Sequence, residues 1–175
     1  MSTTHSAENK ISHLDMESSW GTVRIVAKDG KIRSCRLPSL FAEPHKSFKW
    51  IGSEINAASA ADGRVLKKAE QFARNVFGGK KCEPPPFAWP ESTPFTLRVW
   101  RALAAIPRGT TLEYIAVAKK IGRPGGSRAV GRACGANPLP LFIPCHRVLP
   151  KDGTLGGFTG GLPWKRLLLE REGAR

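Results

Sequence analysis

The sequence predicts an α/β fold of the α+β kind, in which a part with a β-hairpin and a helix precedes a mainly helical part with a helix-turn-helix. Two short β-type runs flank Asp29-Gly30 early in the chain, and three segments of helical periodicity lie in its second half. Prolines at 84–86 and at 90 separate the two parts. With 175 residues, 41% of them hydrophobic, the chain can fill one sizeable domain or two small ones.

The N-terminal part follows a polar stretch. Residues 1–19 lack hydrophobic periodicity, so we expect a flexible tail there and ordered structure from Trp20 onward. Residues 22–27 and 31–37 favour two strands joined by a tight turn at Asp29-Gly30. Apolar residues recur at helical spacing over residues 64–77, and Gly78-Gly79 predicts the end of that helix.

The proline-rich stretch marks the predicted domain boundary. Three consecutive prolines can extend neither a helix nor a central strand, so we expect a semi-rigid linker over residues 83–92. The predicted organisation is a tail over 1–19, an N-terminal α/β domain over 20–82, the linker, and a C-terminal domain over 93–175.

Three helices are predicted in the C-terminal part. The first spans 96–106 and ends before Pro107, the second spans 112–121 with Thr111 as its cap, and the third spans 127–135 with Ser127 as its N-cap. A glycine-containing turn over 122–126 joins the last two helices. Such a pair is a helix-turn-helix, a motif that binds DNA in some proteins and has no contact with DNA in others.

The second helix of this pair carries small side chains where a helix that reads the major groove usually carries long ones. Ser127, Ala129, Gly131 and Ala133 would let its backbone approach DNA closely, which suits the minor groove and predicts weak sequence preference. Arg128 is free to reach into the base stack. Pairing with a phosphate or a carboxylate is an equally open role for this arginine.

The charge of the chain favours a polyanionic partner. It holds 28 Lys and Arg against 14 Asp and Glu, a formal net charge of +14. Residues 91–175 hold 14 basic against 5 acidic residues, whereas residues 1–90 hold 14 against 9, so the C-terminal part is the more basic. Solubility alone remains the other explanation of the excess.

The cysteine pattern and the hydropathy pattern limit the class of protein. Cys35, Cys82, Cys134 and Cys145 include no C-x-x-C pair, which argues against a disulfide framework and a zinc finger and leaves free thiols. No apolar run approaches 18 residues, and residues 1–19 lack the features of a secretion signal. We therefore expect a cytoplasmic protein in a reducing compartment, without a membrane partner.

The dipeptide Cys145-His146 is the candidate chemical centre. The apolar run over 141–143 should be buried, which places the dipeptide at the edge of the core. A reactive cysteine needs a base or a positive charge to take its proton, and His146 and Arg147 can supply them. An inert buried cysteine beside a surface histidine is the alternative that the dipeptide alone leaves open.

Further motifs surround this dipeptide, in a fixed order. They are Arg128-Ala129-Val130-Gly131, Asn137-Pro138, Pro144-Cys145-His146-Arg147-Val148, Gly160-Gly161-Leu162, Lys165, Leu168-Leu169 and Glu172. Over residues 93–173 the chain resembles the O6-alkylguanine-DNA alkyltransferase family. The resemblance implies a ribonuclease H-like N-terminal domain, a winged-helix-like C-terminal domain, and direct DNA repair by irreversible transfer of an alkyl group from O6-alkylguanine to the protein.

The resemblance also implies a role for each catalytic residue. Cys145 would accept the alkyl group, and His146 would take the thiol proton through a water molecule. Glu172 would orient His146, and Tyr114 would donate its hydroxyl proton toward guanine N3. Asn137 would bridge the recognition helix to the active-site segment.

Other residues of the family pattern would bind DNA or the extruded base. Arg128 would fill the hole that a flipped nucleotide leaves. The expected DNA-binding set is Thr111, Ser127, Arg128, Ala129, Gly131 and Arg132, and the expected base-binding set is Tyr114, Pro140, Val148, Phe158, Thr159 and Gly160. No metal and no organic cofactor is expected. The implied partner is double-stranded DNA bound by a monomer with little sequence specificity, in the nucleoid or, in a eukaryote, in the nucleus.

Some questions stay open at the level of sequence. Thr159 and Glu113 depart from residues common in the family, and Cys35 and Cys82 match no zinc site of its members. The preferred alkyl group, activity on O4-alkylthymine and cooperative binding along DNA are undetermined. A relative that binds alkylguanine without chemistry is the leading alternative, although such relatives lack the acceptor cysteine. A sequence-specific helix-turn-helix regulator is another.

Overall fold

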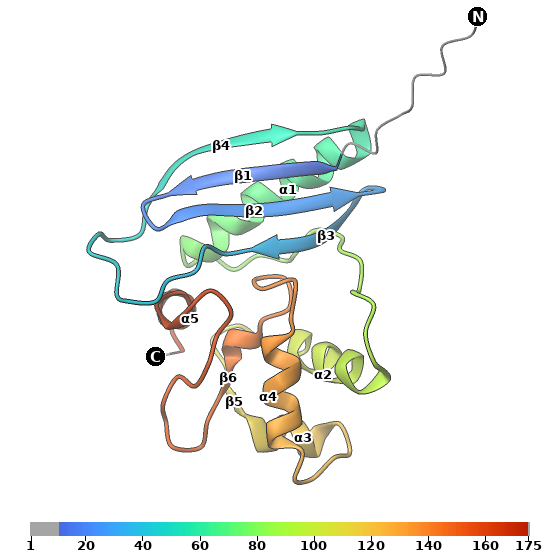
Figure 1. Cartoon of the computed structure of the whole chain (residues 1–175), viewed down its shortest axis with the longest axis vertical. Coiled ribbons are helices and arrows are strands. Elements are labelled where there is room, and N and C mark those ends of the chain that lie inside the picture. Colours follow the sequence, from blue (N-terminus) through green and yellow to red (C-terminus); the bar gives the residue numbers. More distant parts are fainter. Residues whose placement is uncertain (1–10, 175) are drawn as a thin grey trace, which may run out of the picture.

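The computed structural model describes residues 11–174, in which a four-stranded sheet backed by one helix stands above a cluster of shorter helices (Figure 1). The strands are β1 (Ser12–Ser18), β2 (Gly21–Lys28), β3 (Lys31–Arg36) and β4 (Trp50–Asn56). They lie in the order β3-β2-β1-β4, and every neighbouring pair is antiparallel. This confirms the α+β fold class.

The predicted hairpin is confirmed as β2 and β3. Asp29 and Gly30 join the two strands with φ angles of 56° and 69°, the left-handed conformation that a two-residue hairpin turn requires. Val23, Ile25 and Ala27 alternate with more exposed residues and point into the core.

The predicted flexible tail over 1–19 is wrong for residues 12–18, because they form β1 between β2 and β4. Leu14 and Met16 are completely buried, with polar residues between them. Two apolar residues in seven are a weak strand signal, and the strand is stabilised by ladders on both edges. Residues 1–10 of the predicted tail lie outside the described part of the chain.

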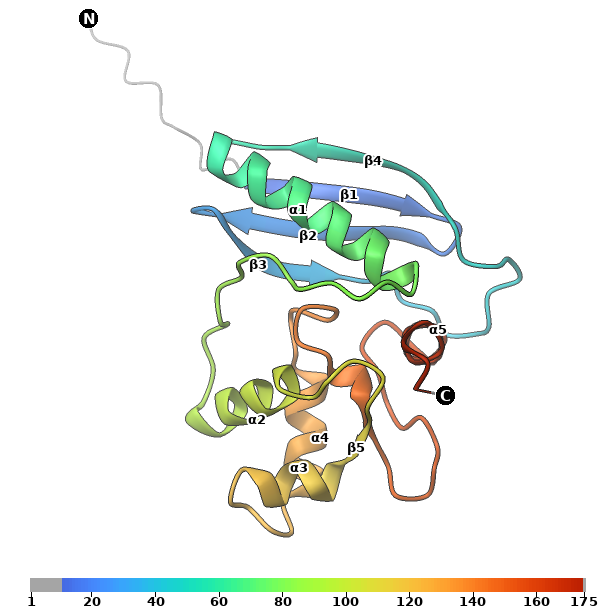
Figure 2. The same ribbon diagram turned by 180° about the vertical axis from the view of Figure 1, so that it is seen from behind.

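Helix α1 (Ala60–Phe77) covers the back of the sheet (Figure 2). It begins at Ala60, before the predicted position 64, because the Ser59 side chain accepts a hydrogen bond from the Asp62 amide and caps the helix. Its predicted end is confirmed at Gly78.

The proline-rich residues 83–92 form neither helix nor strand, apart from one bridge between Phe87 and Ile32. The Ile32 amide donates to the Pro86 carbonyl at 3.0 Å, and the Ala88 amide donates to the Ile32 carbonyl at 2.8 Å. These bonds hold the stretch against β3.

The lower layer holds α2 (Pro94–Ala104), α3 (Tyr114–Lys120), α4 (Ser127–Gly135) and α5 (Leu162–Glu172). A 3-10 turn, η1, spans Cys145–Arg147. Two short strands, β5 (Leu112–Glu113) and β6 (Val148–Leu149), pair in parallel. Helices α3 and α4 pack together, which confirms the helix-turn-helix.

Two predicted caps in this motif are wrong. Residues 112–113 pair with β6, so α3 starts at Tyr114 and Thr111 does not cap it. Ser127 is the first residue of α4, and Gly126 occupies the N-cap position.

Helix α5 joins the two layers. Trp164 and Leu168 are fully buried in a hydrophobic core that continues from the sheet to the lower helices. The Trp164 ring meets Trp20, Phe48 and Phe77, with ring centroids 5.0 to 5.6 Å apart. None of the helices within residues 11–174 is both long and apolar enough to span a membrane.

Candidate active site

Cys145 opens the turn η1, and Asn137 holds it in place. The Asn137 Nδ2 atom donates to the Ile143 carbonyl at 2.8 Å and to Cys145 Sγ at 3.3 Å, while its Oδ1 accepts from the Leu139 amide at 3.0 Å. Asn137 is 3% exposed and follows α4 directly. Asn137 therefore links the chain just after α4 to the segment that carries Cys145.

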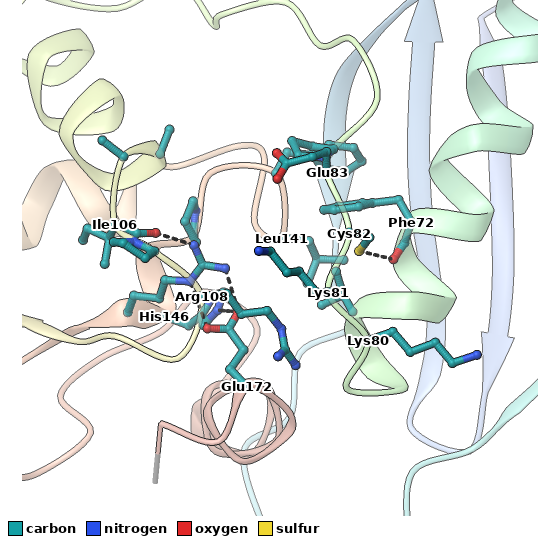
Figure 3. A pocket seen from close by; sticks show the side chains of 18 of the residues that line it. Phe72, Lys80, Lys81, Cys82, Glu83, Ile106, Arg108, Leu141, His146 and Glu172 are labelled. Atoms are coloured by element: carbon teal, nitrogen blue, oxygen red, sulfur yellow. Dashed lines mark hydrogen bonds and ion pairs between the residues drawn. The ribbon is translucent and has the colours of Figure 1, made fainter.

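His146 and Glu172 form a buried pair on one side of Cys145. His146 Nε2 lies 2.9 Å from Glu172 Oε1 (Figure 3). Arg147 donates to the same carboxylate through Nε at 2.9 Å and Nη2 at 2.8 Å. Burial alone would raise the pKa of Glu172, but the hydrogen bonds from His146 and Arg147 outweigh it and lower that pKa to about 2. Glu172 is therefore ionised at neutral pH.

The protonation of His146 follows from this pairing. Burial lowers the pKa of His146, against the opposing effect of Glu172, so its ring is neutral at neutral pH. A carboxylate only accepts hydrogen bonds, so Nε2 carries the ring proton and Nδ1 keeps the lone pair. Nδ1 is buried and has no hydrogen-bond partner among the described residues. The free lone pair makes Nδ1 the basic atom of the site.

The Cys145 thiol is 4% exposed. Burial raises its pKa, although the hydrogen bond from Asn137 and the charge of Lys165 act in the opposite direction. Cys145 is thus a protonated thiol at neutral pH, which becomes a strong nucleophile when a base removes the proton.

A pocket of about 390 Å³ opens beside Cys145. Its other lining residues come from α3, from α4 and from the loop before α5: Tyr114, Gly131, Cys134, Gly135, Gly157, Phe158 and Thr159. Burial, with smaller effects from Cys134 and Cys145, raises the pKa of Tyr114 to about 12. The phenol therefore remains a hydrogen-bond donor, and a volume in this range suits a small organic ligand.

Some predicted residues lie beside the pocket rather than on its wall. Phe158 and Thr159 line it, whereas Pro140, Val148 and Gly160 do not. Pro140 is buried, and the Val148 carbonyl accepts a 2.7 Å hydrogen bond from Lys165 Nζ. Gly160 faces Leu37 and Trp164.

The predicted DNA-binding residues lie on and near α4. Arg128 and Arg132 are exposed, and Ser127, Ala129 and Gly131 are partly exposed along the same helix. Thr111 is partly exposed just before β5. This helix therefore presents two guanidinium groups between small side chains.

Three further residues gain a place in the site only from the structure, although the sequence had already drawn attention to Arg147 and Lys165. Lys165 is fully buried, Arg147 braces Glu172, and Cys134 lines the pocket. The unusual sequence signal for Lys165 is a lysine among the apolar residues of α5. Nothing in the local sequence singles out Cys134.

A second cavity, of about 340 Å³, includes His146 and Glu172 in its lining (Figure 3). His146, Arg147 and Glu172 line it together with Arg108 and residues 80–84, whereas Cys145 lines only the first pocket. The neighbouring residues Cys145 and His146 therefore line two different cavities.

Comparison with known proteins gives consistent matches. The family model described as 6-O-methylguanine DNA methyltransferase, DNA binding domain, matches residues 94–174. The methylated-DNA–protein-cysteine methyltransferase of Salmonella typhimurium is 52% identical over 126 residues, 72% of this chain and 71% of that protein. The inducible enzyme of that name from Bacillus subtilis is 50% identical over 127 residues, 71% of this chain and 70% of its own length.

Solved structures agree with these matches. Mycobacterium tuberculosis OGT, solved in complex with DNA, superposes with a TM-score of 0.74 at 31% identity and covers 91% of both chains. The O6-methylguanine-DNA methyltransferase of Pyrococcus kodakaraensis, at 21% identity and a TM-score of 0.51, shares the fold.

Proposed function

Because the chain belongs to the methylated-DNA–protein-cysteine methyltransferase family and so repairs DNA directly by alkyl transfer to a cysteine, we propose that Cys145 is that cysteine and O6-alkylguanine its substrate. One observation carries the choice of residue. Of the four cysteines, only Cys145 both lines the pocket and adjoins the buried His146–Glu172 pair.

The first step of the proposed reaction is the loss of the thiol proton. His146 Nδ1, which holds the free lone pair, takes the proton from Cys145 directly or through one water molecule. Glu172 accepts from Nε2 and stabilises the positive charge that forms on the ring. Asn137 and Lys165 favour the thiolate, because each lowers the pKa of Cys145 against the effect of burial.

The second step is an in-line displacement. A lone pair of Sγ forms the new bond to the alkyl carbon, the bond from that carbon to guanine O6 breaks, and its electron pair remains on the base. Tyr114 donates its proton to N3 of guanine and relieves that negative charge. These two steps leave His146 protonated and Tyr114 deprotonated. Transfer of a proton from His146 to Tyr114 through solvent restores both residues, so that on balance the thiol proton moves to guanine. The product is a thioether without an electrophilic acyl or phosphoryl centre, so each protein molecule reacts once.

Access to the alkyl group requires the nucleotide to leave the duplex. Extrusion costs on the order of a few kcal/mol in lost stacking and pairing. We assign Arg128 to the vacated space, because it is the exposed long side chain at the start of α4. The partly exposed residues Ser127, Ala129 and Gly131 allow close approach to the minor groove, and Thr111 and Arg132 contact the backbone.

DNA is the partner of this chain, and the finer properties are part of the proposal. The protein acts as a monomer with little sequence preference, in the compartment that holds DNA. No metal or organic cofactor takes part in the proposed steps, since the thiol, the base and the proton donor all belong to the chain.

The acceptor assignment is tested by mass spectrometry after incubation with a methylated duplex. We expect one added methyl group per molecule, on the peptide that contains Cys145. Cys145→Ser should remove the adduct and leave duplex binding intact, because only the nucleophile is weakened. An unmodified Cys145 peptide would instead favour a protein that binds the lesion without chemistry, and a loss of DNA binding in the variant would indicate a structural cysteine.

A further inference from the structure

The loop between β3 and β4 descends from the sheet to the start of α5 (Figure 1). We call residues 38–43 of this loop the strap, and residues 157–160 the lid. The Leu40 amide donates to the Gly160 carbonyl at 2.7 Å, and Trp164 Nε1 donates to the Pro38 carbonyl at 2.8 Å. Arg166 pairs with Glu43 at 2.6 Å. The strap is therefore bound to the end of the lid and to the first turns of α5.

Two glycines permit this close approach. Gly160 and Gly161 have φ angles of 93° and 108°, which strongly favour glycine. A Cβ atom on Gly161 would lie far inside van der Waals contact with the Leu40 carbonyl oxygen, and one on Gly160 would lie 3.2 Å from Leu37 Cβ. The contact between strap and lid therefore depends on the absence of a side chain at 161.

The lid is also held from the opposite side. Thr159 Oγ1 donates to the Gly135 carbonyl at the end of α4, at 3.1 Å. Gly157, Phe158 and Thr159 line the pocket beside Cys145. The lid, which lines the pocket, thus lies between the strap and α4.

We propose that the strap is a positioning element for the alkyl-transfer reaction: it fixes the lid so that the N-terminal part of the chain sets the affinity of the pocket for the alkylated base. This inference rests on the proposed function of Cys145. A preformed lid avoids the entropic cost of ordering a free loop when the base enters, so the strap should act on binding more than on the chemical step.

The test uses the full chain with the Gly161→Ala substitution and free O6-benzylguanine as the probe. The rate of alkylation of Cys145 is measured against probe concentration, which separates the half-saturating concentration KI from the limiting rate constant. We expect KI to rise about tenfold, as for the loss of one or two hydrogen bonds, with the limiting rate nearly unchanged. Gly52→Ala is the control, because Gly52 lies on β4 with open space around its Cα.

Trp164→Phe gives a second, milder test that does not depend on the folding of Gly161→Ala. Phenylalanine keeps a ring in the aromatic cluster with Trp20 and Phe48 but cannot donate to the Pro38 carbonyl. Hydrogen exchange of the lid amides is measured in parallel, and we expect it to accelerate together with the rise in KI.

The outcomes separate this inference from the proposed function. Faster hydrogen exchange of the lid amides with an unchanged KI overturns the inference. A decrease of the limiting rate constant without a rise in KI overturns it as well. If Cys145 of the unsubstituted chain takes up no methyl group from a methylated duplex, the proposed function fails, and hydrogen exchange of the lid amides in the variants still decides whether the strap holds the lid. Unchanged exchange in both variants overturns the positioning role.

Discussion

Cys145, His146 and Tyr114 share an environment that keeps each of them uncharged. Burial is the largest influence on all three, raising the pKa of the thiol and of the phenol and lowering that of the imidazole. Glu172 differs because hydrogen bonds from His146 and Arg147 overcome the effect of burial on its carboxyl group. The resting site thus pairs a neutral thiol with a neutral base, and these two groups become charged only during the reaction.

These protonation states predict the pH dependence of transfer. The base is active only when neutral, so the rate should fall as pH drops through the pKa of His146, which lies below its ordinary value of 6.5. Above that limb the rate should stay level up to about pH 9, because burial holds the pKa of the Cys145 thiol above its ordinary value of 9.0 and Tyr114 keeps its proton to about pH 12. Single-turnover rates with free O6-benzylguanine measure this without the pH dependence of DNA binding. An acid limb centred above pH 6.5 would contradict the assignment of His146.

The residues proposed to be catalytic could be named from the sequence, whereas the hydrogen bonds that hold them could not. The order of the motifs indicates that Cys145, His146, Asn137 and Glu172 belong together. The structure shows two hydrogen-bonded pairs, Asn137 with Cys145 and His146 with Glu172, and Cys145 and His146 are neighbours in the chain. Lys165 bonds the Val148 carbonyl across a gap of seventeen positions in the chain. Such contacts depend on how α5 packs against β6, which no local pattern encodes.

On helix α4, the small residues proposed to lie against DNA are distinct from the arginine proposed to replace the extruded base. Arg128 is exposed at its start, and Val130 and Cys134 face the interior. The small residues between them keep the helix narrow, so a single long side chain can enter the duplex without steric conflict.

Arg128→Ala should therefore slow repair of a methylated duplex by about tenfold or more, because the extruded nucleotide is no longer replaced in the stack. Transfer from free O6-benzylguanine needs no extrusion and should keep its rate. Arg64→Ala, on the exposed side of α1, is the matched control. Equal slowing with both substrates would contradict the extrusion role of Arg128.

Helices and strands whose ends are marked by turn or cap residues could be predicted from the sequence. Strands that depend on pairing with a strand far away in the sequence could not. The hairpin around Asp29-Gly30 and the end of α1 at Gly78 follow from local turn and cap chemistry. Strand β4 pairs with β1 across about forty residues of sequence, and β5 pairs with β6 across a similar distance. The pairing of β5 explains why a helix predicted from position 112 begins at Tyr114.

At the scale of the whole molecule, we propose an N-terminal unit, a proline-rich linker over 83–92 and a C-terminal unit. Three contacts argue that the two units act together. The Cys35 amide donates to the Pro138 carbonyl at 2.9 Å, the strap binds the lid, and Trp164 packs against the aromatic residues of the sheet layer. The N-terminal unit thus supports the site without contributing a reacting group.

The distribution of charge sets the expected interaction with DNA. The basic excess is greater in residues 91–175, where the helix-turn-helix and the pocket lie, than in residues 1–90. Phosphate contacts of this kind supply affinity without sequence information. Affinity for unrelated duplexes should therefore be similar, and a strong preference for one site would favour a regulator.

The dependence of duplex affinity on salt tests this interface directly. Each phosphate neutralised should contribute a slope of about −0.9 to log K against log salt concentration, so affinity should fall steeply as salt rises. Arg132→Gln on α4 should make the slope shallower by about 0.9 if Arg132 neutralises one phosphate, with nearly the same effect on every duplex sequence. Lys67→Gln, at an exposed position on α1 in the other layer, should leave the slope unchanged.

Titrations at four or more salt concentrations with two unrelated duplexes would measure both slopes. Two results would contradict an interface dominated by phosphate contacts and centred on α4. One is an affinity of the unsubstituted protein that does not change with salt, and the other is an equal change of slope in the two variants.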